Sequence, residues 1–175
     1  MIKTLIKYVG EYKKDSIKTP IYMIFEVLFE ILIPFVTASI IDKGIQAGDM
    51  GKVCMYGGIM LILAFASLFC GIQAGKYAAS ASTGFACNLR EGIYENIQNF
   101  AFSNIDKYST AGLITRMTTD VNVLQNMIIS GFRPITRGPS LLIMGIGLSF
   151  YMNPKLAFVF VVCTPILAII LFLIV

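Results

Sequence analysis

The sequence predicts an all-α membrane protein with long transmembrane helices and cytoplasmic extensions, and three observations carry this prediction. Of the 175 residues, 57% are hydrophobic and only 14% are charged, whereas a soluble domain carries roughly 25% charged residues. The mean hydropathy is +0.77. Apolar stretches of about 20 residues, the length that crosses a bilayer core, recur along the chain. Together they exclude an ordinary soluble globule and a disordered segment, since disorder requires low hydrophobicity.

The side-chain inventory excludes several classes of function. A net charge of +4, spread along the chain, gives no reason to expect a nucleic-acid partner. There is no His, and the four cysteines are widely spaced without a Cys-x-x-Cys pair, so neither a metal site nor a disulfide framework is predicted. We expect the cysteines to be small buried side chains: Cys54, Cys70, Cys87 and Cys163. No catalytic residue is predicted in this chain.

Residues 1–19 predict an amphipathic helix that leads into the first span. Five lysines precede the first apolar run, so the segment lacks the form of a cleaved secretory signal. Its apolar side chains share one helical face, the pattern of an elbow helix in the membrane interface; they are Ile2, Leu5, Ile6, Val9 and Tyr12. An unstructured basic tail is the alternative. The lysine excess here, compared with the balanced charges of residues 42–52, places the N-terminus in the cytoplasm.

The first span covers residues 20–41 and contains two acidic residues. Glu26 and Glu30 are four residues apart and therefore share one face of a helix. At that depth a charged side chain is costly unless it is protonated, paired or facing water. We therefore expect both to face the interior. They would serve either a substrate or ion pathway, or a structural pairing with a cation such as Lys76 or with a helix outside this chain.

The second span and its cytoplasmic extension occupy residues 53–105. No charge occurs between Lys52 and Lys76, which suits the membrane core. From there to Arg133 the chain is too polar for the core, yet it contains no proline. Helix can therefore continue straight out of the bilayer.

Two apolar stripes predict that the chain leaves the membrane and returns as a pair of packed helices. The outgoing stripe is Phe85, Leu89, Ile93, Ile97 and Phe100, and the returning stripe is Ile114, Met117, Val121, Leu124 and Ile128. A turn at residues 106–111 would let the stripes bury each other as an antiparallel rod. Ordering such a rod costs conformational entropy that burial in the membrane does not offset, so we expect its tip to contact a cytoplasmic partner.

The rod returns into a third span, and a fourth follows. Residues 112–152 combine the returning arm with a membrane span. Arg137 lies near one end of this span, where its side chain can snorkel to the interface. Asn153-Pro154 predicts a tight turn, because proline cannot continue a helix. Residues 155–175 form the fourth span, which is incomplete at Val175. Spans three and four are expected to make an antiparallel hairpin.

The rod tip carries a family resemblance. Residues 105–121 read IDKYSTAGLITRMTTDV and resemble the first intracellular loop of ATP-binding cassette (ABC) exporters, in which Asp, Ser/Thr, a small residue, Leu, Arg and Asp follow in fixed order. Residues 40–45 and Arg137-Gly138-Pro139 are also similar to that family. The chain thus resembles the N-terminal part of a half-transporter subunit. It would comprise about four of the six spans of an exporter transmembrane domain of type 1, also called type IV. Ala111-Gly112 departs from the pattern, since the family often has Gly and then an acidic residue there.

The resemblance implies that residues 106–111 form a coupling helix that docks on a nucleotide-binding domain. The coupling residues would be Asp106, Ser109, Thr110, Arg116 and Asp120. By residue type alone, the first three are good helix caps and the last two can pair across one helical turn; ordinary caps and a solvated face are the alternative reading.

The chain lacks the motif that would bind ATP itself. Its nearest approach to a phosphate-binding loop, Gly51-Lys52, has Gln46 and Val53 where Gly and Ser or Thr are required. No cofactor is therefore expected in this chain. ATP and Mg²⁺ are expected on a nucleotide-binding domain, in the same full-length chain or a separate one.

The expected function is the transmembrane part of an ATP-driven exporter that works by alternating access. The resemblance implies a second transporter half, as a homodimer or heterodimer, in a multi-pass arrangement in the cell membrane. One alternative is a secondary transporter or channel that uses Glu26 and Glu30 as ion sites. Another is an inactive truncated fragment. The long cytoplasmic rod favours the exporter, because a proton-coupled carrier has no evident need of it.

Overall fold

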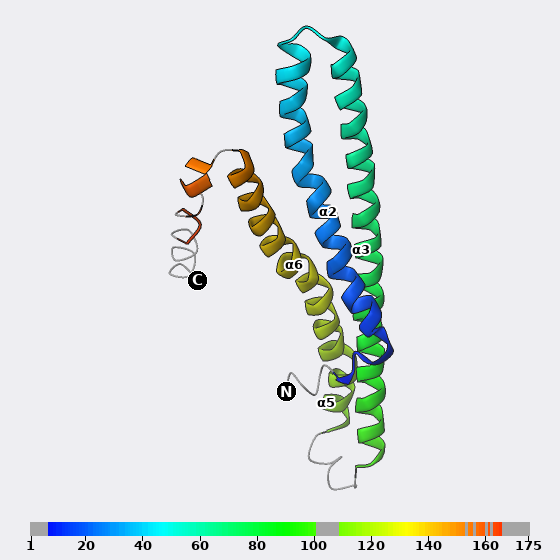
Figure 1. Ribbon diagram of the computed structural model, residues 1–175. Helices are drawn as coiled ribbons and strands as arrows, with labels where there is room; N and C mark the ends of the chain where they lie inside the picture. Colours follow the sequence, from blue (N-terminus) through cyan, green and yellow to red (C-terminus); the bar gives the residue numbers. More distant parts are fainter. Residues whose placement is uncertain are drawn as a thin grey trace. The chain divides into compact units, whose positions relative to one another are not determined.

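The chain is helical along nearly all of the residues that the computed structural model describes (Figure 1). These are residues 7–100, 109–152, 154–155, 157–159, 161 and 163–165. In order they form η1 (Gly10–Tyr12), α2 (Lys13–Ile40), η2 (Ile41–Ile45), α3 (Met50–Gln98), α5 (Thr110–Thr115), η3 (Arg116–Asp120) and α6 (Val121–Met152). No strand occurs in this described part of the chain, and the predicted all-α fold class is confirmed.

Helix α3 is far longer than a membrane crossing requires. Its 49 residues rise roughly 70 Å at 1.5 Å per residue, more than twice the bilayer core of about 30 Å. Two stretches are long and apolar enough to cross a membrane, Gly10–Ile45 and Met50–Gln98. The predicted third span is helical within α6, which is not one of these two, and most of the predicted fourth span lies outside the described residues. The third and fourth crossings stay predictions.

The chain divides into two units, which are described separately. Unit 1 comprises Met1–Phe25 and Leu68–Thr136, and unit 2 comprises Glu26–Ser67 and Arg137–Val175. Helices α2, α3 and α6 each pass from one unit into the other.

The core of unit 1 forms where α3 meets α6. Phe85, Ala86 and Leu89 of α3 are buried together with Val121 of α6. Partly buried hydrophobic side chains pack around them: Tyr8, Val9, Ile93, Leu124 and Ile128. The two predicted stripes therefore do pack against each other at these positions, and the N-terminal segment adds side chains that the stripes did not include.

The returning stripe differs from the prediction at its first residue. Leu113 is buried, with 8% of its surface exposed, whereas Ile114 is 58% exposed. The π-helical turn η3 separates both residues from Val121. A π-turn takes up about one residue more than an α-turn, so the inward position two turns before Val121 falls on Leu113. The prediction of Ile114 was wrong because it assumed an uninterrupted α-helix.

The N-terminal segment packs along α3 through two glycines. The ring of Tyr12 occupies the space that a Cβ at Gly84 would need, and the ring of Tyr8 does the same at Gly92. The Asn88 side-chain amide donates a hydrogen bond to the Tyr8 carbonyl oxygen at 3.0 Å. Small residues on α3 therefore let the aromatic side chains of the N-terminal segment approach closely.

An aromatic pair continues this packing further along α2. The rings of Tyr22 and Tyr77 stack with their centroids 5.4 Å apart, and Lys18 Nζ lies 4.9 Å from the centroid of the Tyr77 ring. Tyrosine and lysine often gather where a helix leaves the bilayer. Helix α2 begins at Lys13, so residues 13–19 run directly into the predicted first span. An elbow lying in the membrane interface stays a prediction.

Unit 2 exposes large apolar side chains along its helices. Examples with 61–69% of their surface exposed are Leu61, Ile62, Phe65 and Ile143. The Ser67 hydroxyl donates to the Glu26 carbonyl oxygen at 3.4 Å, linking α3 to α2. Contiguous exposed apolar surface of this kind is typical of contact with lipid or with another protein segment.

The connection between η2 and α3 is fixed by Asp49. Its Oδ1 accepts a hydrogen bond from the Lys52 backbone N–H at 3.2 Å, and its Oδ2 lies 3.1 Å from Lys52 Nζ. The hydrogen bonds from the Lys52 ammonium and then from the Lys52 backbone N–H hold the pKa of the Asp49 carboxyl below its ordinary value of 3.8. The preceding Gly48 has a φ of +66°, a left-handed conformation that glycine adopts without steric cost.

The prediction that all four cysteines are buried is confirmed for Cys70 alone. Cys54, Cys87 and Cys163 are exposed. The prediction failed because it assumed that each cysteine faces a protein neighbour, whereas these three lie on surfaces that the described residues leave uncovered.

Candidate functional site

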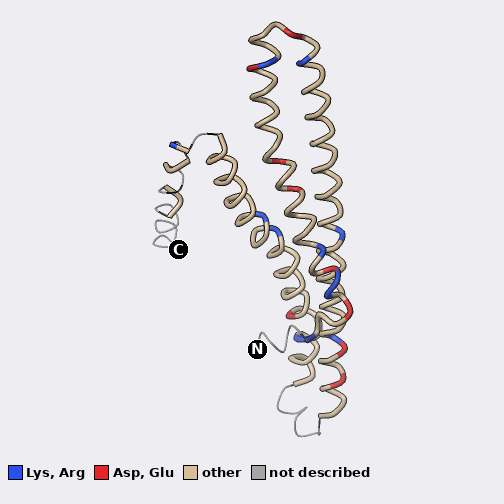
Figure 2. Tube along the Cα trace, in the orientation of Figure 1, with Lys and Arg blue, Asp and Glu red and all other residues tan. Residues whose placement is uncertain are grey.

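Two glutamates of α2, both within the predicted first span, contact one arginine of α6. Arg137 Nη1 lies 3.1 Å from Glu26 Oε1. Arg137 Nη2 lies 2.8 Å and 2.7 Å from the two carboxylate oxygens of Glu30. All three residues belong to unit 2, and we call them the Glu26–Arg137–Glu30 triad. Charged residues are otherwise sparse along the middle of α2 (Figure 2).

The local structure explains how one guanidinium reaches two carboxylates. Glu26 and Glu30 lie one turn apart on a continuous helix, so both side chains project from the same face. The planar guanidinium presents several N–H donors in a fixed fork, which lets it bind both acids at once. The Glu26 side chain is 12% exposed and the Arg137 side chain 33% exposed, so water screens this contact only in part.

The structure identifies a partner for Glu26 and Glu30, for which the sequence had left two possibilities open. They could serve a substrate or ion pathway, or they could pair with a cation such as Lys76 or with a helix outside this chain. Arg137 was expected to snorkel toward the membrane edge. The cation that binds them is Arg137. A charge-matching argument could have found it, because Arg137 is the basic residue inside the predicted third span.

The coupling residues are described only from Ser109 onward, and Asp106 lies outside the described residues. Ser109 is the N-cap of α5, where its Oγ accepts a hydrogen bond from the Gly112 N–H at 3.2 Å. Its φ of +54° turns the chain sharply before the helix begins. Thr110 is the first residue of α5 and is exposed. The predicted cap is therefore confirmed at Ser109, whereas Thr110 is the first helical residue and not the cap.

Arg116 and Asp120 lie at the two ends of the π-turn η3. Both are exposed, and both border a cavity of about 460 Å³ between α3 and the returning arm, which Leu113 and Val121 also line. Pairing of Arg116 with Asp120 stays a prediction.

Polar contacts fix the register of the two arms beside that cavity. Arg90 Nη2 donates to Asn122 Oδ1 at 2.6 Å, and Gln125 Nε2 donates to Thr83 Oγ1 at 3.3 Å. Together with the Phe85 core these contacts join α3 to α6 as one packed pair within unit 1. A displacement applied at one end of such a pair is transmitted along it, because packed side chains resist compression.

Within the described residues, no group of three or more His, Cys, Asp or Glu side chains could hold a metal ion.

The family of the chain is identified by its similarity to known proteins. The model of the ABC transporter transmembrane region matches residues 19–175. The chain belongs to this family.

Curated relatives of this transmembrane region are ABC proteins as well. An uncharacterized ABC transporter ATP-binding protein of Bacillus subtilis, YfiB, is 38% identical over 147 residues, which covers 84% of the chain and 26% of the relative. A putative export ATP-binding/permease protein of Rickettsia conorii is 26% identical over 176 residues, covering 97% of the chain and 29% of the relative. The chain therefore spans between a quarter and a third of the length of these relatives.

Proposed function

We propose that this ABC transporter transmembrane region belongs to an ATP-driven exporter that moves its substrate across the cell membrane by alternating access. The family is that of ABC transporters, and several relatives carry names that include export and permease. This family favours an ABC-type transporter over a secondary transporter or channel. The N-terminus and the tip of the α3–α6 pair would face the cytoplasm, as the lysine distribution predicts.

Energy would come from a nucleotide-binding domain that holds ATP and Mg²⁺, with a second transporter half completing the assembly. This chain has no phosphate-binding loop, so its own contribution is mechanical. Helix α3 is long enough to cross a bilayer and still extend roughly 40 Å beyond its core. That extension, packed against the returning arm, gives the nucleotide-binding domain a stiff element to move.

The observation that carries this proposal is the packed pair of arms that ends at the capped turn before α5. The coupling contact would be made by Asp106, Ser109 and Thr110, with Arg116 and Asp120 one to three turns further along. Coupling is a free energy stored in the contact between two bodies, so damage at the tip should separate ATP hydrolysis from transport.

The test replaces Asp106, Ser109 and Thr110 together by Ala in the full-length transporter. Transport per ATP hydrolysed should fall, while surface yield and nucleotide binding stay nearly unchanged. Caps contribute about 1 kcal/mol each, so the melting temperature is measured in parallel. The matched control is Asn126→Ala with Ser130→Ala, two exposed polar residues of α6 in the same unit. A normal transport-to-ATP ratio in a folded triple variant would show that the partner docks elsewhere.

Orientation is tested by labelling single cysteines in a background without the four native ones. Met50→Cys, at a position 76% exposed next to the short connection before α3, should react with an impermeant reagent in intact cells. Thr119→Cys, on the exposed π-turn, should react only after the membrane is opened. The reverse pattern would place the rod outside the cell and contradict the proposal.

The Glu26–Arg137–Glu30 triad would border the substrate pathway. Glu26→Gln with Glu30→Gln should change substrate-stimulated ATPase or transport more than folding yield. Because that double variant leaves Arg137 without its carboxylates, the informative comparison adds Arg137→Gln, which removes all three charges. Normal transport in the uncharged triple variant would assign the triad a purely structural role.

A further inference from the structure

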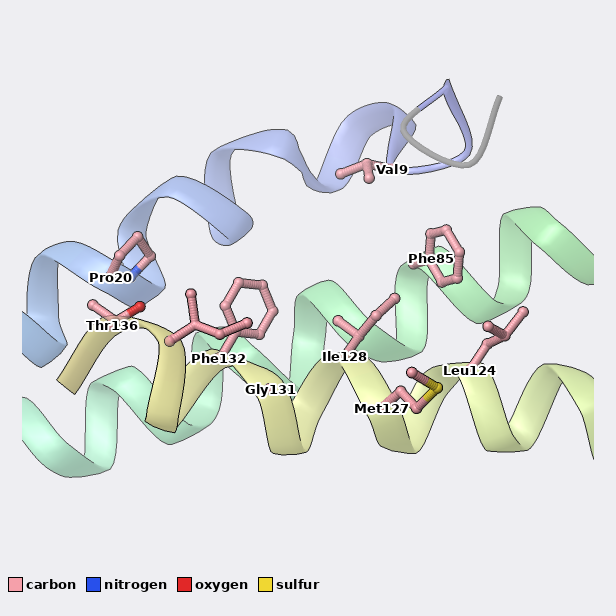
Figure 3. Close-up of a pocket in the computed structure, with 10 residues that line it drawn as sticks. Val9, Pro20, Phe85, Leu124, Met127, Ile128, Gly131, Phe132 and Thr136 are labelled. Atoms are coloured by element: carbon pink, nitrogen blue, oxygen red, sulfur yellow. The ribbon is translucent and has the colours of Figure 1, made fainter. Parts of the chain in front are cut away.

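An apolar groove in unit 1 shares none of its lining residues with the predicted coupling residues or with the triad. Its volume is about 500 Å³, inside the range of about 300–1,000 Å³ for ligand pockets. Its walls include Val9, Pro20 of α2, Phe85 of α3, and Met127, Gly131 and Phe132 of α6. Figure 3 shows Val9 and Pro20 on one wall and the α6 side chains Ile128 and Phe132 on the facing wall.

The groove offers a ligand almost nothing but hydrocarbon. Thr136 supplies the polar side chain among its lining residues. Met127 and Ile135 on its border are 66% and 74% exposed. Apolar area of this extent favours an apolar occupant, since covering it removes it from water.

The chain segment that carries the groove residues Val9 and Pro20 is basic. Its exposed lysines are Lys7, Lys13, Lys14 and Lys18, set against the acids Glu11 and Asp15. The Asp15 carboxylate accepts a hydrogen bond from the Ser80 hydroxyl at 2.7 Å. Lysines near a membrane surface attract anionic lipid headgroups. An apolar groove beside a basic chain segment therefore complements an amphiphile with an anionic head.

The groove also ends where the predicted membrane spans begin. Pro20 is the first residue of the predicted first span, and Ile135 is two residues before Arg137, which was predicted to lie near one end of the third span. With the N-terminus in the cytoplasm, this end of the groove opens at the cytoplasmic leaflet. The location depends on the proposed function only through that orientation, which the cysteine labelling above tests separately.

We propose that this groove binds one acyl chain of an anionic phospholipid from the cytoplasmic leaflet, with Lys13 and Lys14 contacting the headgroup. The lipid ties the N-terminal segment to α6, two elements whose facing side chains leave the groove open between them. Anionic lipid then stabilises the packing of the N-terminal segment in unit 1.

The experiment uses the full-length transporter in phosphatidylcholine vesicles that contain a minor fraction of phosphatidylglycerol with a photoreactive diazirine in its acyl chain. Labelled peptides are identified by mass spectrometry without ATP, so the result does not depend on transport. Label is expected on the peptides that contain Phe132 and Val9. The same experiment with a photoreactive phosphatidylcholine probe separates headgroup recognition from simple apolar contact.

Gly131→Leu blocks the groove. A Cβ at Gly131 meets only the Ile135 side chain, at an ordinary 3.6 Å, so the new side chain fits and extends into the space. Labelling should drop about tenfold, as expected if two methylene groups of the lipid lose their burial. Gly138→Leu is the matched control on the same helix, because a Cβ there meets nothing within 4 Å. Its labelling should stay unchanged, and melting temperatures confirm that both variants fold.

Lys13→Gln with Lys14→Gln tests the headgroup contact. Labelling by phosphatidylglycerol should fall about fivefold or more, given roughly 1 kcal/mol for each lysine near an anionic surface, while labelling by phosphatidylcholine should not change. The proposal is wrong if the groove peptides carry no label, or if both lipids label them equally and the lysine substitutions have no effect. It is also wrong if a cysteine introduced by Met127→Cys forms a cross-link to a transporter segment after residue 175, because that segment would then occupy the groove in place of lipid.

Discussion

Different interactions stabilise the interior of each of the two units, although the same three long helices, α2, α3 and α6, run through both. In unit 1, α3 buries small and apolar side chains against its neighbours: Ala74, Ala78, Ala81, Phe85, Ala86 and Leu89. In unit 2, none of the α3 residues is buried, and Leu61, Ile62 and Phe65 are exposed. Exposed apolar side chains of α3 also occur in unit 1, at Leu68, Phe69 and Ile72. In unit 2 the contact between α2 and α6 is made by the Glu26–Arg137–Glu30 triad.

This difference agrees with the sequence-based prediction that one part of the helix contacts lipid and the other part contacts water. Apolar burial drives helices together in water, but it gives little advantage in a bilayer, where lipid tails are as apolar as leucine. Polar contacts between helices matter more there, since lipid offers charged groups no partner. Unit 1 thus has the interior of a water-soluble helical bundle, and unit 2 has the surface and the polar link expected of membrane helices.

The largest effect should follow from removing the charge partner in unit 2. Arg137→Met leaves two carboxylates without their guanidinium, at a cost of about 3 kcal/mol on the scale of a charged residue in a membrane helix. Unfolding of the purified protein in lipid nanodiscs measures this loss. Glu26→Gln and Glu30→Gln added to Arg137→Met should restore most of the stability. No recovery in that triple variant would mean that the triad is not what joins α2 to α6.

The next effect tests whether unit 1 depends on the register set by the π-turn. Leu113→Ala should destabilise the protein by about 2 kcal/mol, the lower end for a buried leucine, because Leu113 borders a cavity. Ile114→Ala, one residue later and exposed, should change stability by less than about 0.5 kcal/mol. Thermal unfolding of the two variants gives the comparison. The opposite order would show that the helix is α-helical throughout this turn.

A smaller effect is expected where aromatic rings cover glycines of α3. Gly84→Val places side-chain atoms where the Tyr12 ring lies and should cost about 1–2 kcal/mol as overpacking. Gly75→Val on the same helix meets nothing within 4 Å at its Cβ and serves as the control. Protease sensitivity of the N-terminal segment should rise only in the first variant. Equal sensitivity would indicate that the N-terminal segment is not packed on α3.

The smallest effect concerns a polar link of unit 2 that lies at the exposed end of its helices. Because the folded state lowers the pKa of Asp49 below 3.8, its contribution is present at neutral pH and is lost as the pH falls through that lowered value. Asp49→Asn keeps an acceptor for the cap but removes the charge, so its melting temperature should respond less to acid between pH 5 and pH 3 than that of the unchanged protein. Identical pH profiles would show that Lys52 does not stabilise the carboxylate in solution.

The local pattern of the sequence determined the helices, the face that carries the two glutamates and the cap at Ser109. These features depend on residues within a turn or two of each other, where the 3.6-residue period and side-chain chemistry decide the outcome. The apolar stripes on α3 and the returning arm also predicted the Phe85, Leu89 and Val121 contacts. The family resemblance was visible for the same reason, since the loop motif is contiguous.

Only the tertiary structure decided which residues from distant parts of the chain meet. Arg137 is more than a hundred residues from Glu26 and Glu30. Charge matching makes it a candidate partner, but only the packing of α2 against α6 decides that the three side chains meet. The burial of Leu113 in place of Ile114 depends on a π-turn, which alters the helical period and leaves no mark in the apolar spacing. The fit of Tyr8 and Tyr12 over Gly92 and Gly84 depends on the register between two helices, which is set by the packing of whole surfaces rather than by either sequence alone.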